Sequence, residues 1–544
     1  MSGPLLRIED LSIHFGPHDE PVKAVEQASF EVARGETVVL VGESGSGKSI
    51  SALAAMRLLP HAARVVSGSV ELDGTDLLAV SERQMRDIRG GRIGMIFQEP
   101  QSSLNPVLTI GRQIGEVLSR HKGMRGERLR ARAIELLKAV EIPEPERRYG
   151  EYPHQFSGGM KQRVMIAIAM AAEPALLIAD EPTTALDVTV QAQVLELLRK
   201  QQRETDMGIL FITHDLGVAY QMADRIVVMK NGGVVESGPR DEFYRAPQHA
   251  YSKQLFDALP SREKRQREGL DLSITNPQPV LEITDLKVHY AIRRGVFKRI
   301  VGHVKAVDGV NLTVNRGTTV AVVGESGSGK TTMGKGILRL LPVSGGSVSY
   351  KGRDLASLSA AEMRAYRSDL QVVFQDPYSS MNPRMMVADI IREGMVAQGI
   401  GGNRVAQEAR VDELLRQVGL EPAHKFRYPH EFSGGQRQRV CIARALAVDP
   451  DVIICDEPTS ALDVSVQAQI LDLLRDLQQR LDLSYVFITH NLSVVAYIAH
   501  YVAVMYQGEI VEQGPIDAIL DSPQHPYTQK LLAAIPKIGE PRVA

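Results

Sequence analysis

A glycine-rich octapeptide occurs twice in this chain and constrains its fold more than any other feature. It reads GESGSGKS at 42–49 and returns as GESGSGKT at 324–331. Each copy follows a short apolar run, at 37–41 and 319–323, and precedes a segment of helical composition. A glycine-rich loop between a strand and a helix points backbone N–H groups and the helix dipole at an anion. We therefore predict an anion-binding loop in each half of the chain.

The residue types of the octapeptide narrow the anion to a nucleotide. In the pattern G-x-x-x-x-G-K-[ST], the Lys reaches the β- and γ-phosphates and the hydroxyl holds Mg²⁺. A chance turn of Gly and Ser would explain one match, but two matches in the same context argue against chance. The residues predicted to bind nucleotide are Gly42, Glu43, Ser44, Gly45, Ser46, Gly47, Lys48 and Ser49, and Gly324, Glu325, Ser326, Gly327, Ser328, Gly329, Lys330 and Thr331.

The repeat extends well beyond the octapeptide. Residues 6–15 (LRIEDLSIHF) match 281–290 (LEITDLKVHY), and the tetrapeptide FITH occurs at both 211–214 and 487–490. Each half is far longer than a solenoid repeat and is predicted to be a whole domain.

The chain length also requires more than one domain, because 544 residues exceed the size of a single hydrophobic core. We predict a first domain at 1–260 and a second at 280–544. The segment 261–279 between them is charged, poor in apolar residues and flanked by Pro, so we predict a solvated linker.

Charge and composition exclude several classes of protein. The net charge is -2, so nothing indicates a nucleic-acid partner. The two cysteines, Cys441 and Cys455, lie in apolar surroundings, which predicts buried thiols in a reducing compartment and too few ligands for a zinc or iron–sulfur site. No apolar run approaches the roughly 20 residues that a membrane span needs, and no signal-peptide core follows Met1. We expect a soluble chain whose membrane role, if any, comes from partners.

Within a half, strand-like and helix-like segments alternate. Apolar runs at 175–179, 208–213 and 225–229 are typical of strands, while the pattern is helical between Gln98 and Ser157. Such alternation predicts the α/β class with a mostly parallel sheet. We expect antiparallel strands at the start of each half and a helical insertion after Gln98, and the second half repeats this pattern.

An apolar strand in each half ends in two carboxylates. These are Asp180 and Glu181 in the first half and Asp456 and Glu457 in the second. Neighbouring side chains of a strand point to opposite faces, so the pair can divide its work. The Asp is predicted to hold Mg²⁺ through a water, and the Glu, beyond the γ-phosphate, to take the proton of an attacking water. An Asp-Glu pair alone is often a solvated turn, but here it accompanies a phosphate loop.

Further polar residues end apolar runs in both halves. Gln98 and Gln375 suit a ligand to Mg²⁺ or to the attacking water, and His214 and His490 suit contact with phosphate and a part in catalysis. A single His at a strand end is usually structural, but two in register favour a function.

An aromatic residue closes the first strand of each half. Phe15 and Tyr290 could stack on the adenine ring, or they could belong to the core, as aromatics at strand ends often do. Spacing alone leaves both interpretations open.

A Ser-Gly-Gly turn opens a helical run in each half. The Ser suits a helix N-cap, and the bare glycines expose a second anion site. Two phosphate-binding elements in each half suggest that the halves pair head to tail, so that each ATP lies between one half's loop and the other half's turn. The residues of these turns are Ser157, Gly158, Gly159, Ser433, Gly434 and Gly435.

Together these motifs resemble those of the ATP-binding-cassette (ABC) ATPases over nearly the whole chain. The octapeptides resemble Walker A, the Asp-Glu pairs Walker B with its catalytic Glu, and the Ser-Gly-Gly turns the signature motif. Residues 185–187 and 461–463 resemble D-loops, and His214 and His490 resemble switch histidines. The two strand-end aromatics match the adenine-stacking position. The resemblance implies two tandem nucleotide-binding domains, each a P-loop α/β core with an antiparallel β subdomain and a helical insertion, with ATP and Mg²⁺ as cofactors.

A finer resemblance points to the oligopeptide/dipeptide/nickel import branch, and to its fused members that import glutathione or microcin-C-type peptides. The segments 97–106 and 374–383 are similar to that branch, as are the PQHxY segments that end at Tyr251 and Tyr527. Met160 stands where the signature motif has Gln. We expect this change to be tolerated, because the Ser and the glycines contact the phosphate.

The resemblance implies the ATP-hydrolysing subunit of a bacterial importer of short peptides or glutathione-like substrates. Two transmembrane permease subunits would place coupling helices on the insertions beyond Gln98 and Gln375, and a substrate-binding protein would deliver the cargo. The chain would lie at the cytoplasmic face of the inner membrane as a peripheral protein, with no nucleic acid.

The alternative is a soluble tandem cassette that acts on ribosomes or nucleic acid. The near-neutral charge, the short linker and the lack of zinc-binding cysteines argue against it. The basic stretch 291–303 fits either a solvated hairpin or contact with lipid headgroups.

Overall fold

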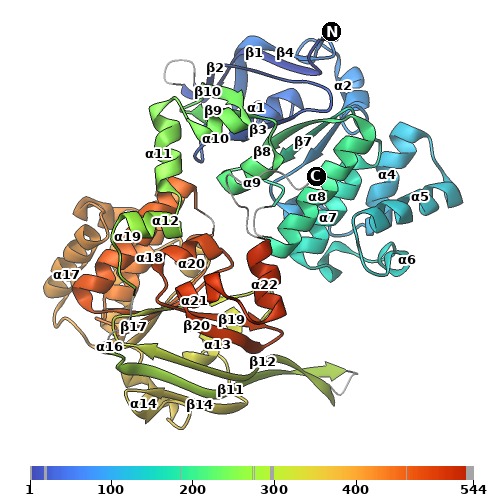
Figure 1. Cartoon of the computed structure of the whole chain (residues 1–544). Helices are drawn as coiled ribbons and strands as arrows, with labels where there is room; N and C mark the ends of the chain where they lie inside the picture. The colour runs from blue at the N-terminus through green and yellow to red at the C-terminus, as the bar shows by residue number, and fades with distance from the viewer. Residues whose placement is uncertain are drawn as a thin grey trace. The chain divides into compact units, whose positions relative to one another are not determined.

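The computed structural model of the protein describes residues 3–17, 21–183, 186–272, 274, 276–294, 299–460 and 462–534. Its contacts divide the chain between Phe256 and Asp257 into two compact units. Each unit combines a mostly parallel sheet, a smaller antiparallel sheet and surrounding helices (Figure 1). The predicted α/β class with two tandem domains of this kind is confirmed.

The larger sheet of each unit has six strands, ordered β10-β9-β3-β8-β7-β6 in the first and β16-β17-β18-β13-β19-β20 in the second. Neighbours pair in parallel except at β9–β10 and β19–β20. The strands β3, β7 and β8 are buried along their whole length, as continuous apolar strands covered on both faces should be. The bounds are β3 (Thr37–Val41), β6 (Ile93–Ile96), β7 (Leu176–Asp180), β8 (Gly208–Ile212), β9 (Arg225–Lys230), β10 (Gly233–Pro239), β13 (Thr319–Val323), β16 (Leu370–Val373), β17 (Val452–Asp456), β18 (Ser484–Ile488), β19 (Tyr501–Tyr506) and β20 (Glu509–Pro515).

The smaller sheet of each unit has four antiparallel strands, ordered β2-β1-β4-β5 and β12-β11-β14-β15. The predicted antiparallel strands at the start of each half are therefore confirmed. Strands β11 and β12 pair as far as Arg294 opposite Arg299, so the two described arms of the basic stretch 291–303 are antiparallel strands in their backbone. Residues 295–298 lie outside the described residues, and the contact with lipid headgroups stays untested. The bounds are β1 (Leu6–Phe15), β2 (Val22–Val32), β4 (Ala63–Leu72), β5 (Thr75–Asp76), β11 (Pro279–Arg294), β12 (Arg299–Asn315), β14 (Gly345–Tyr350) and β15 (Arg353–Asp354).

Helices cover the larger sheets and form the insertions. The predicted helical insertion after Gln98 is confirmed by α3 to α6, and its counterpart in the second unit comprises α15 to α17. The first set is α1 (Lys48–Ala55), α2 (Glu82–Ile88), α3 (Pro100–Ser103), α4 (Ile110–Lys122), α5 (Gly126–Ala139), α6 (Pro145–Arg148), η1 (Pro153–Gln155), α7 (Gly158–Met170), α8 (Val188–Thr205), α9 (Leu216–Met222), α10 (Arg240–Arg245), α11 (Ala250–Ala258) and α12 (Arg262–Arg267). The second set is α13 (Lys330–Ile337), α14 (Ala360–Ala365), α15 (Pro377–Ser380), α16 (Val387–Gln398), α17 (Arg404–Gln417), η2 (Pro422–Phe426), η3 (Pro429–Glu431), α18 (Gly434–Leu446), α19 (Val464–Leu481), α20 (Leu492–Ile498), α21 (Ile516–Asp521) and α22 (Pro526–Ala533).

The structure places the start of the predicted solvated linker at 261–279 against the second unit and leaves residues 276–279 at its end exposed. The first part of this segment folds as α12, and Arg265 on that helix is only 5% exposed. The Arg265 guanidinium donates to Asp517 of α21 at 2.6 Å, and Leu270 packs against the core of the second unit. A long Arg side chain can bury its stem while its charged end pairs with a carboxylate, so a charged composition did not prevent packing. The domain boundaries at 260 and 280 stay a prediction.

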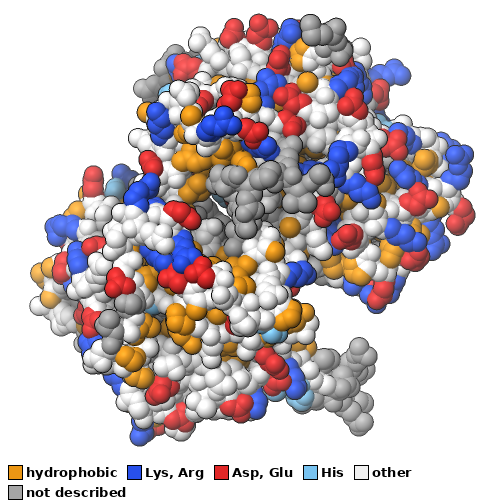
Figure 2. Space-filling model, viewed as in Figure 1, with side chains coloured by type: hydrophobic (Ala, Val, Ile, Leu, Met, Phe, Trp, Pro, Cys, Tyr) orange, Lys and Arg blue, Asp and Glu red, His pale blue; other side chains and the backbone are white. Residues whose placement is uncertain are grey.

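The buried cysteines and the mixed surface charge agree with the composition of the chain. Both cysteines are buried, as predicted, Cys441 in α18 and Cys455 in β17. Acidic and basic side chains are intermingled over the visible face (Figure 2). No helix within the described residues is both long and apolar enough to cross a membrane.

Candidate functional site

Each glycine-rich loop connects a buried strand to a helix, β3 to α1 in the first unit and β13 to α13 in the second. Gly42 and Gly324, which begin the loops, have φ of 150° and 154°. A Cβ at Gly42 would lie 2.2 Å from the backbone oxygen of Met229, so only glycine fits there. Helices α1 and α13 begin without a side-chain cap. A helix start of this kind directs its first N–H groups at an anion.

The Lys of each loop is buried and spans the loop. Lys48 Nζ donates to the carbonyl oxygens of Gly42 at 2.7 Å and of Glu43 at 2.8 Å. Lys330 makes the same two hydrogen bonds in the second unit, at 2.7 and 2.8 Å. Lys48 is 5% exposed and Lys330 is 6% exposed. The predicted phosphate-binding Lys therefore lies inside its own loop.

A hydroxyl and a carboxylate lie side by side next to each Lys. Ser49 Oγ donates to Asp180 Oδ1 at 2.9 Å. Thr331 Oγ1 donates to Asp456 Oδ1, also at 2.9 Å. Burial raises the pKa of Asp180 to about 6 against the hydrogen bond from Ser49, and the charge of Glu181 adds to the rise. Burial likewise raises the pKa of Asp456. A cation beside these two carboxylates would stabilise their charged form. The hydroxyl and carboxylate oxygens are also the kind of ligand that Mg²⁺ prefers.

The carboxylate of Glu181, the second of the pair in the first unit, contacts two predicted site residues. Gln98 Nε2 donates to Glu181 Oε2 at 2.9 Å, and His214 Nδ1 lies 3.1 Å from Glu181 Oε1. A carboxylate only accepts hydrogen bonds, so Nδ1 carries the proton and donates. The three side chains follow β6, β7 and β8, which are adjacent in the sheet.

The second unit repeats this cluster. Gln375 Nε2 donates to Glu457 Oε2 at 3.0 Å, and His490 Nδ1 lies 3.2 Å from Glu457 Oε1. Burial raises the pKa of Glu457, but the hydrogen bond from His490, its charge and that of Lys330 outweigh burial and lower it overall. A carboxylate held ionised and oriented is suited to accept a proton from water.

The Ser-Gly-Gly turns start helices α7 and α18. Ser157 Oγ caps α7 by accepting the N–H of Met160 at 3.4 Å. Ser433 caps α18 in the same way, and the side chain of Gln436 in turn accepts the N–H of Ser433 at 3.1 Å. Met160 has no oxygen with which to close this capping box. Both serines are exposed. The head-to-tail pairing of these turns with the loops stays a prediction.

The strand-end aromatics and the D-loops are placed only in part. Tyr290 is 43% exposed, which favours stacking over a core position, and Phe15 is partly buried. Asp187 caps α8 by accepting the N–H of Val190 at 2.9 Å. Of the predicted D-loops, Ala185 and Ala461 lie outside the described residues.

Two residues near the loops received no role from the sequence. The N–H of Glu43 donates to the hydroxyl of Tyr251 at 3.1 Å, and the N–H of Glu325 donates to that of Tyr527 at 2.9 Å. Both tyrosines end the repeated PQHxY segments. The repetition of these segments was the signal that could have found them.

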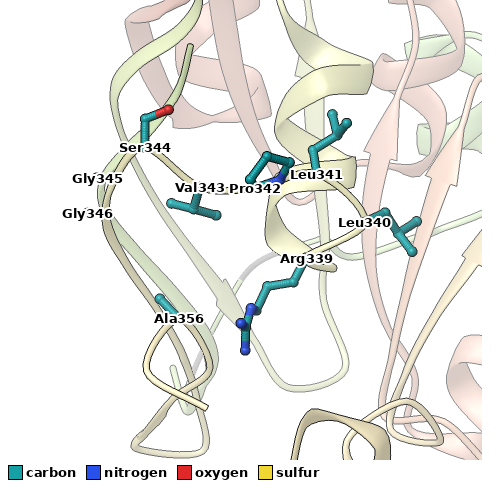
Figure 3. Close-up of a pocket in the computed structure, with 9 residues that line it drawn as sticks. All are labelled: Arg339, Leu340, Leu341, Pro342, Val343, Ser344, Gly345, Gly346 and Ala356. Carbon is teal, nitrogen blue, oxygen red and sulfur yellow. The ribbon is translucent and has the colours of Figure 1, made fainter. Parts of the chain in front are cut away.

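A pocket of about 520 Å³ lies apart from these clusters in the second unit. It opens between the end of α13 and β14, and Arg339 in its wall donates to the carbonyl oxygens of Leu355 and Leu358 at 2.7 Å (Figure 3). None of its lining residues is a predicted site residue. The lining is 339–346 and Ala356.

Comparison with known proteins decides the family. Residues 25–184 and 307–460 match the family described as ABC transporter. The chain belongs to the ABC transporter family. As an ABC-type ATPase it binds ATP and hydrolyses it. Residues 235–286 and 511–543 of this ABC ATPase match the oligopeptide/dipeptide transporter C-terminal region.

The matches with curated relatives extend over nearly the whole of this ABC ATPase. The peptidoglycan transport ATP-binding protein YejF of Agrobacterium fabrum is 50% identical, over 98% of this chain and 96% of its own. The glutathione import ATP-binding protein GsiA of Shigella dysenteriae serotype 1 is 46% identical, over 99% of this chain and 90% of its own. Among solved structures, the ATP-binding cassette MJ0796 bound to ADP and Pi is 31% identical over 43% of this chain and 98% of its own, with a TM-score of 0.40.

Proposed function

We propose that this ABC ATPase, which serves an importer, drives uptake of short peptides or glutathione-like substrates across a bacterial inner membrane. Its relatives act in import of glutathione and transport of peptidoglycan. The region described for oligopeptide/dipeptide transporters occurs in both halves. The observation that carries the proposed hydrolysis, on which uptake depends, is the duplicated cluster in which a partly buried carboxylate contacts a Gln and a His.

Hydrolysis in the first unit would use the residues of this cluster. Lys48 contacts the β- and γ-phosphates of ATP. Glu181 accepts a proton from the attacking water, whose oxygen bonds to the γ-phosphorus while the bond to the β–γ bridging oxygen breaks, leaving ADP and phosphate. His214 holds Glu181 in orientation through Nδ1, and its own contact with phosphate stays a prediction. The second unit contains the same set.

Mg²⁺ neutralises charge on the β- and γ-phosphates when it is bound. The hydroxyl–carboxylate contact of 2.9 Å in each unit supports this assignment, because both groups are oxygen ligands. Gln98 and Gln375 contact the general-base carboxylates in this structure, so their share in holding Mg²⁺ would require a change of partner. The proposed ligands are Ser49, Gln98 and Asp180, and Thr331, Gln375 and Asp456.

Closure over ATP would pair the two halves head to tail. In this proposal Ser433 faces the ATP held by Lys48, and Ser157 faces the ATP held by Lys330. The exposed position of both serines at helix starts supports it, since a helix start that is open to a partner can bind a phosphate.

The partners would be two transmembrane permease subunits, which contact the helical insertions, and a substrate-binding protein that reaches the chain only through the assembled transporter. The chain would be peripheral, at the cytoplasmic face of the inner membrane. The similarity to a transport and an import ATP-binding protein, over 98% and 99% of the chain, does not favour a role on ribosomes or nucleic acid.

Gene deletion and purification test this function together. Cells that lack the protein should fail to grow on glutathione or short peptides as sole sulfur or nitrogen source, and the wild-type gene should restore growth. A gene carrying Glu181→Gln and Glu457→Gln is the matched control and should not restore it. The protein should also copurify with two hydrophobic subunits from detergent-solubilised membranes. Normal growth on all these compounds, with loss of nickel or sugar uptake instead, would contradict the substrate assignment.

A further inference from the structure

A tyrosine from the C-terminal region of each half contacts the phosphate loop of the same unit. Tyr251 on α11 lies 208 residues from Glu43, and Tyr527 on α22 lies 202 residues from Glu325. Both tyrosines are buried, at 4% and 8% exposed. In each contact the phenol oxygen accepts the second backbone N–H of the octapeptide.

The N–H that the tyrosine accepts belongs to the same peptide group as a carbonyl that binds the Lys. A peptide bond is planar, so the C=O of Gly42 and the N–H of Glu43 turn together. The C=O of Gly42 accepts from Lys48 at 2.7 Å, while the N–H of Glu43 donates to Tyr251 at 3.1 Å. In the second unit the corresponding distances are 2.7 and 2.9 Å. One peptide group in each loop is therefore held at both ends.

This peptide group needs such support because glycine precedes it. Gly42 has φ of 150°, and the approach of the Met229 oxygen excludes any side chain there. Glycine restricts the backbone less than any other residue, so local sterics do not orient the group. A rotation of the peptide would turn the Gly42 carbonyl away from Lys48. The tyrosine contact opposes that rotation.

Each tyrosine is in turn held by its own PQHxY segment. The Nδ1 of His249 accepts the N–H of Tyr251 at 3.1 Å. The N–H groups of Gln248 and His249 donate to Glu236 of β10 at 2.8 and 3.0 Å. This segment is thereby anchored to the sheet from which the loop emerges.

The second unit repeats the anchor while the surroundings of the ring differ. His525 Nδ1 accepts the N–H of Tyr527 at 3.2 Å, and Glu512 of β20 accepts two backbone N–H groups at 2.7 and 3.0 Å. The Tyr527 ring packs on Tyr506 at 4.3 Å, whereas the Tyr251 ring lies under the ammonium of Lys230 at 4.4 Å. The hydroxyl contact with the loop is the feature that both units share.

We infer that Tyr251 and Tyr527 are positioning residues for ATP binding, each of which orients the Gly–Glu peptide of its own loop so that its carbonyl meets the Lys. The inference rests on the proposed nucleotide role of the two loops. It assigns a function to the C-terminal PQHxY segments within the cassette itself, because they set the shape of the phosphate loop.

The test removes one hydroxyl at a time from the full-length chain and measures binding of a fluorescent ATP analogue. Lys330→Ala leaves the first loop to be measured alone, and Lys48→Ala leaves the second. Tyr251→Phe should weaken binding about fivefold in the Lys330→Ala chain, the effect of losing one hydrogen bond between neutral groups. It should have no effect in the Lys48→Ala chain. Tyr527→Phe should show the opposite dependence.

Tyr506→Phe is the matched control, because the ring of Tyr506 packs on Tyr527 while its hydroxyl accepts a hydrogen bond from the Gln507 side chain. It should leave nucleotide affinity unchanged. Lower thermal stability with unchanged affinity in Tyr251→Phe and Tyr527→Phe would overturn the inference in favour of a purely structural role, and so would equal weakening in both backgrounds. If Lys48→Ala and Lys330→Ala each left two nucleotides bound, the proposed nucleotide sites would fail first and the inference with them.

Discussion

Replacing Asp180 by Asn should stabilise the first unit at neutral pH. The Asp180 side chain is 5% exposed, and burial raises its pKa from 3.8 to about 6. A carboxyl whose pKa is raised on folding binds its proton more tightly in the folded state than in the unfolded state. The free energy of unfolding therefore falls as the pH rises from about 4 to about 6. Two pKa units correspond to about 3 kcal/mol at pH 7.5. Asn has no charge to bury and keeps an oxygen that can accept from Ser49.

Hydrogen exchange read by mass spectrometry measures this effect in one unit at a time. Peptides from β7 report opening of the first unit, and peptides from β17 provide an internal control in the second. At pH 7.5 the Asp180→Asn chain should exchange its slowest β7 amides about 100-fold more slowly than the wild type. At pH 4 the difference should shrink to about two- to threefold, since the folded Asp180 is then protonated and the unfolded one is roughly half protonated. β17 should not change at either pH.

Two results would refute this reasoning. Equal exchange of the β7 amides in the wild type and in Asp180→Asn at pH 7.5 would mean that the buried charge of Asp180 does not destabilise the folded chain. A difference of the same size at pH 4 and pH 7.5 would mean that it does not arise from ionisation. The expected gain in stability should be accompanied by loss of ATP hydrolysis at the first site, because a charge kept at a stability cost is typical of a functional site.

Further predictions concern hydrolysis. Glu457→Gln should lower the single-turnover rate at the second site by about 10²–10⁴-fold while ATP stays bound, and an unchanged rate would exclude Glu457 as the base. His490→Ala should raise the pKa of Glu457, so the acid limb of the pH–rate profile at that site should move to higher pH; an unmoved limb would contradict the contact. Ser433→Arg added to Lys48→Ala should do little further harm, whereas added to Lys330→Ala it should abolish activity. The reverse ranking in ATPase assays would reject head-to-tail pairing.

The sequence by itself determined the local chemistry of this protein. The octapeptide around Lys48 and the carboxylates after an apolar strand at Asp180 could be recognised because each signal involves residues that are neighbours in the chain. The duplication of both motifs also determined the tandem architecture. Alternation of apolar runs with helical patterns then led to the α/β class, since the periodicity of a segment reflects the element it forms.

Only the tertiary structure decided which of these residues meet. Gln98 and Glu181 are 83 residues apart, and they touch because β6 and β7 are neighbours in the sheet. The repeated PQHxY segment marks Tyr251 but not its contact with the loop, and no local signal indicated the burial of Arg265 in a segment of charged composition. The raised pKa of Asp180 likewise follows from burial. Strand order and burial are set by the packing of distant segments, and a local pattern of residues does not encode them.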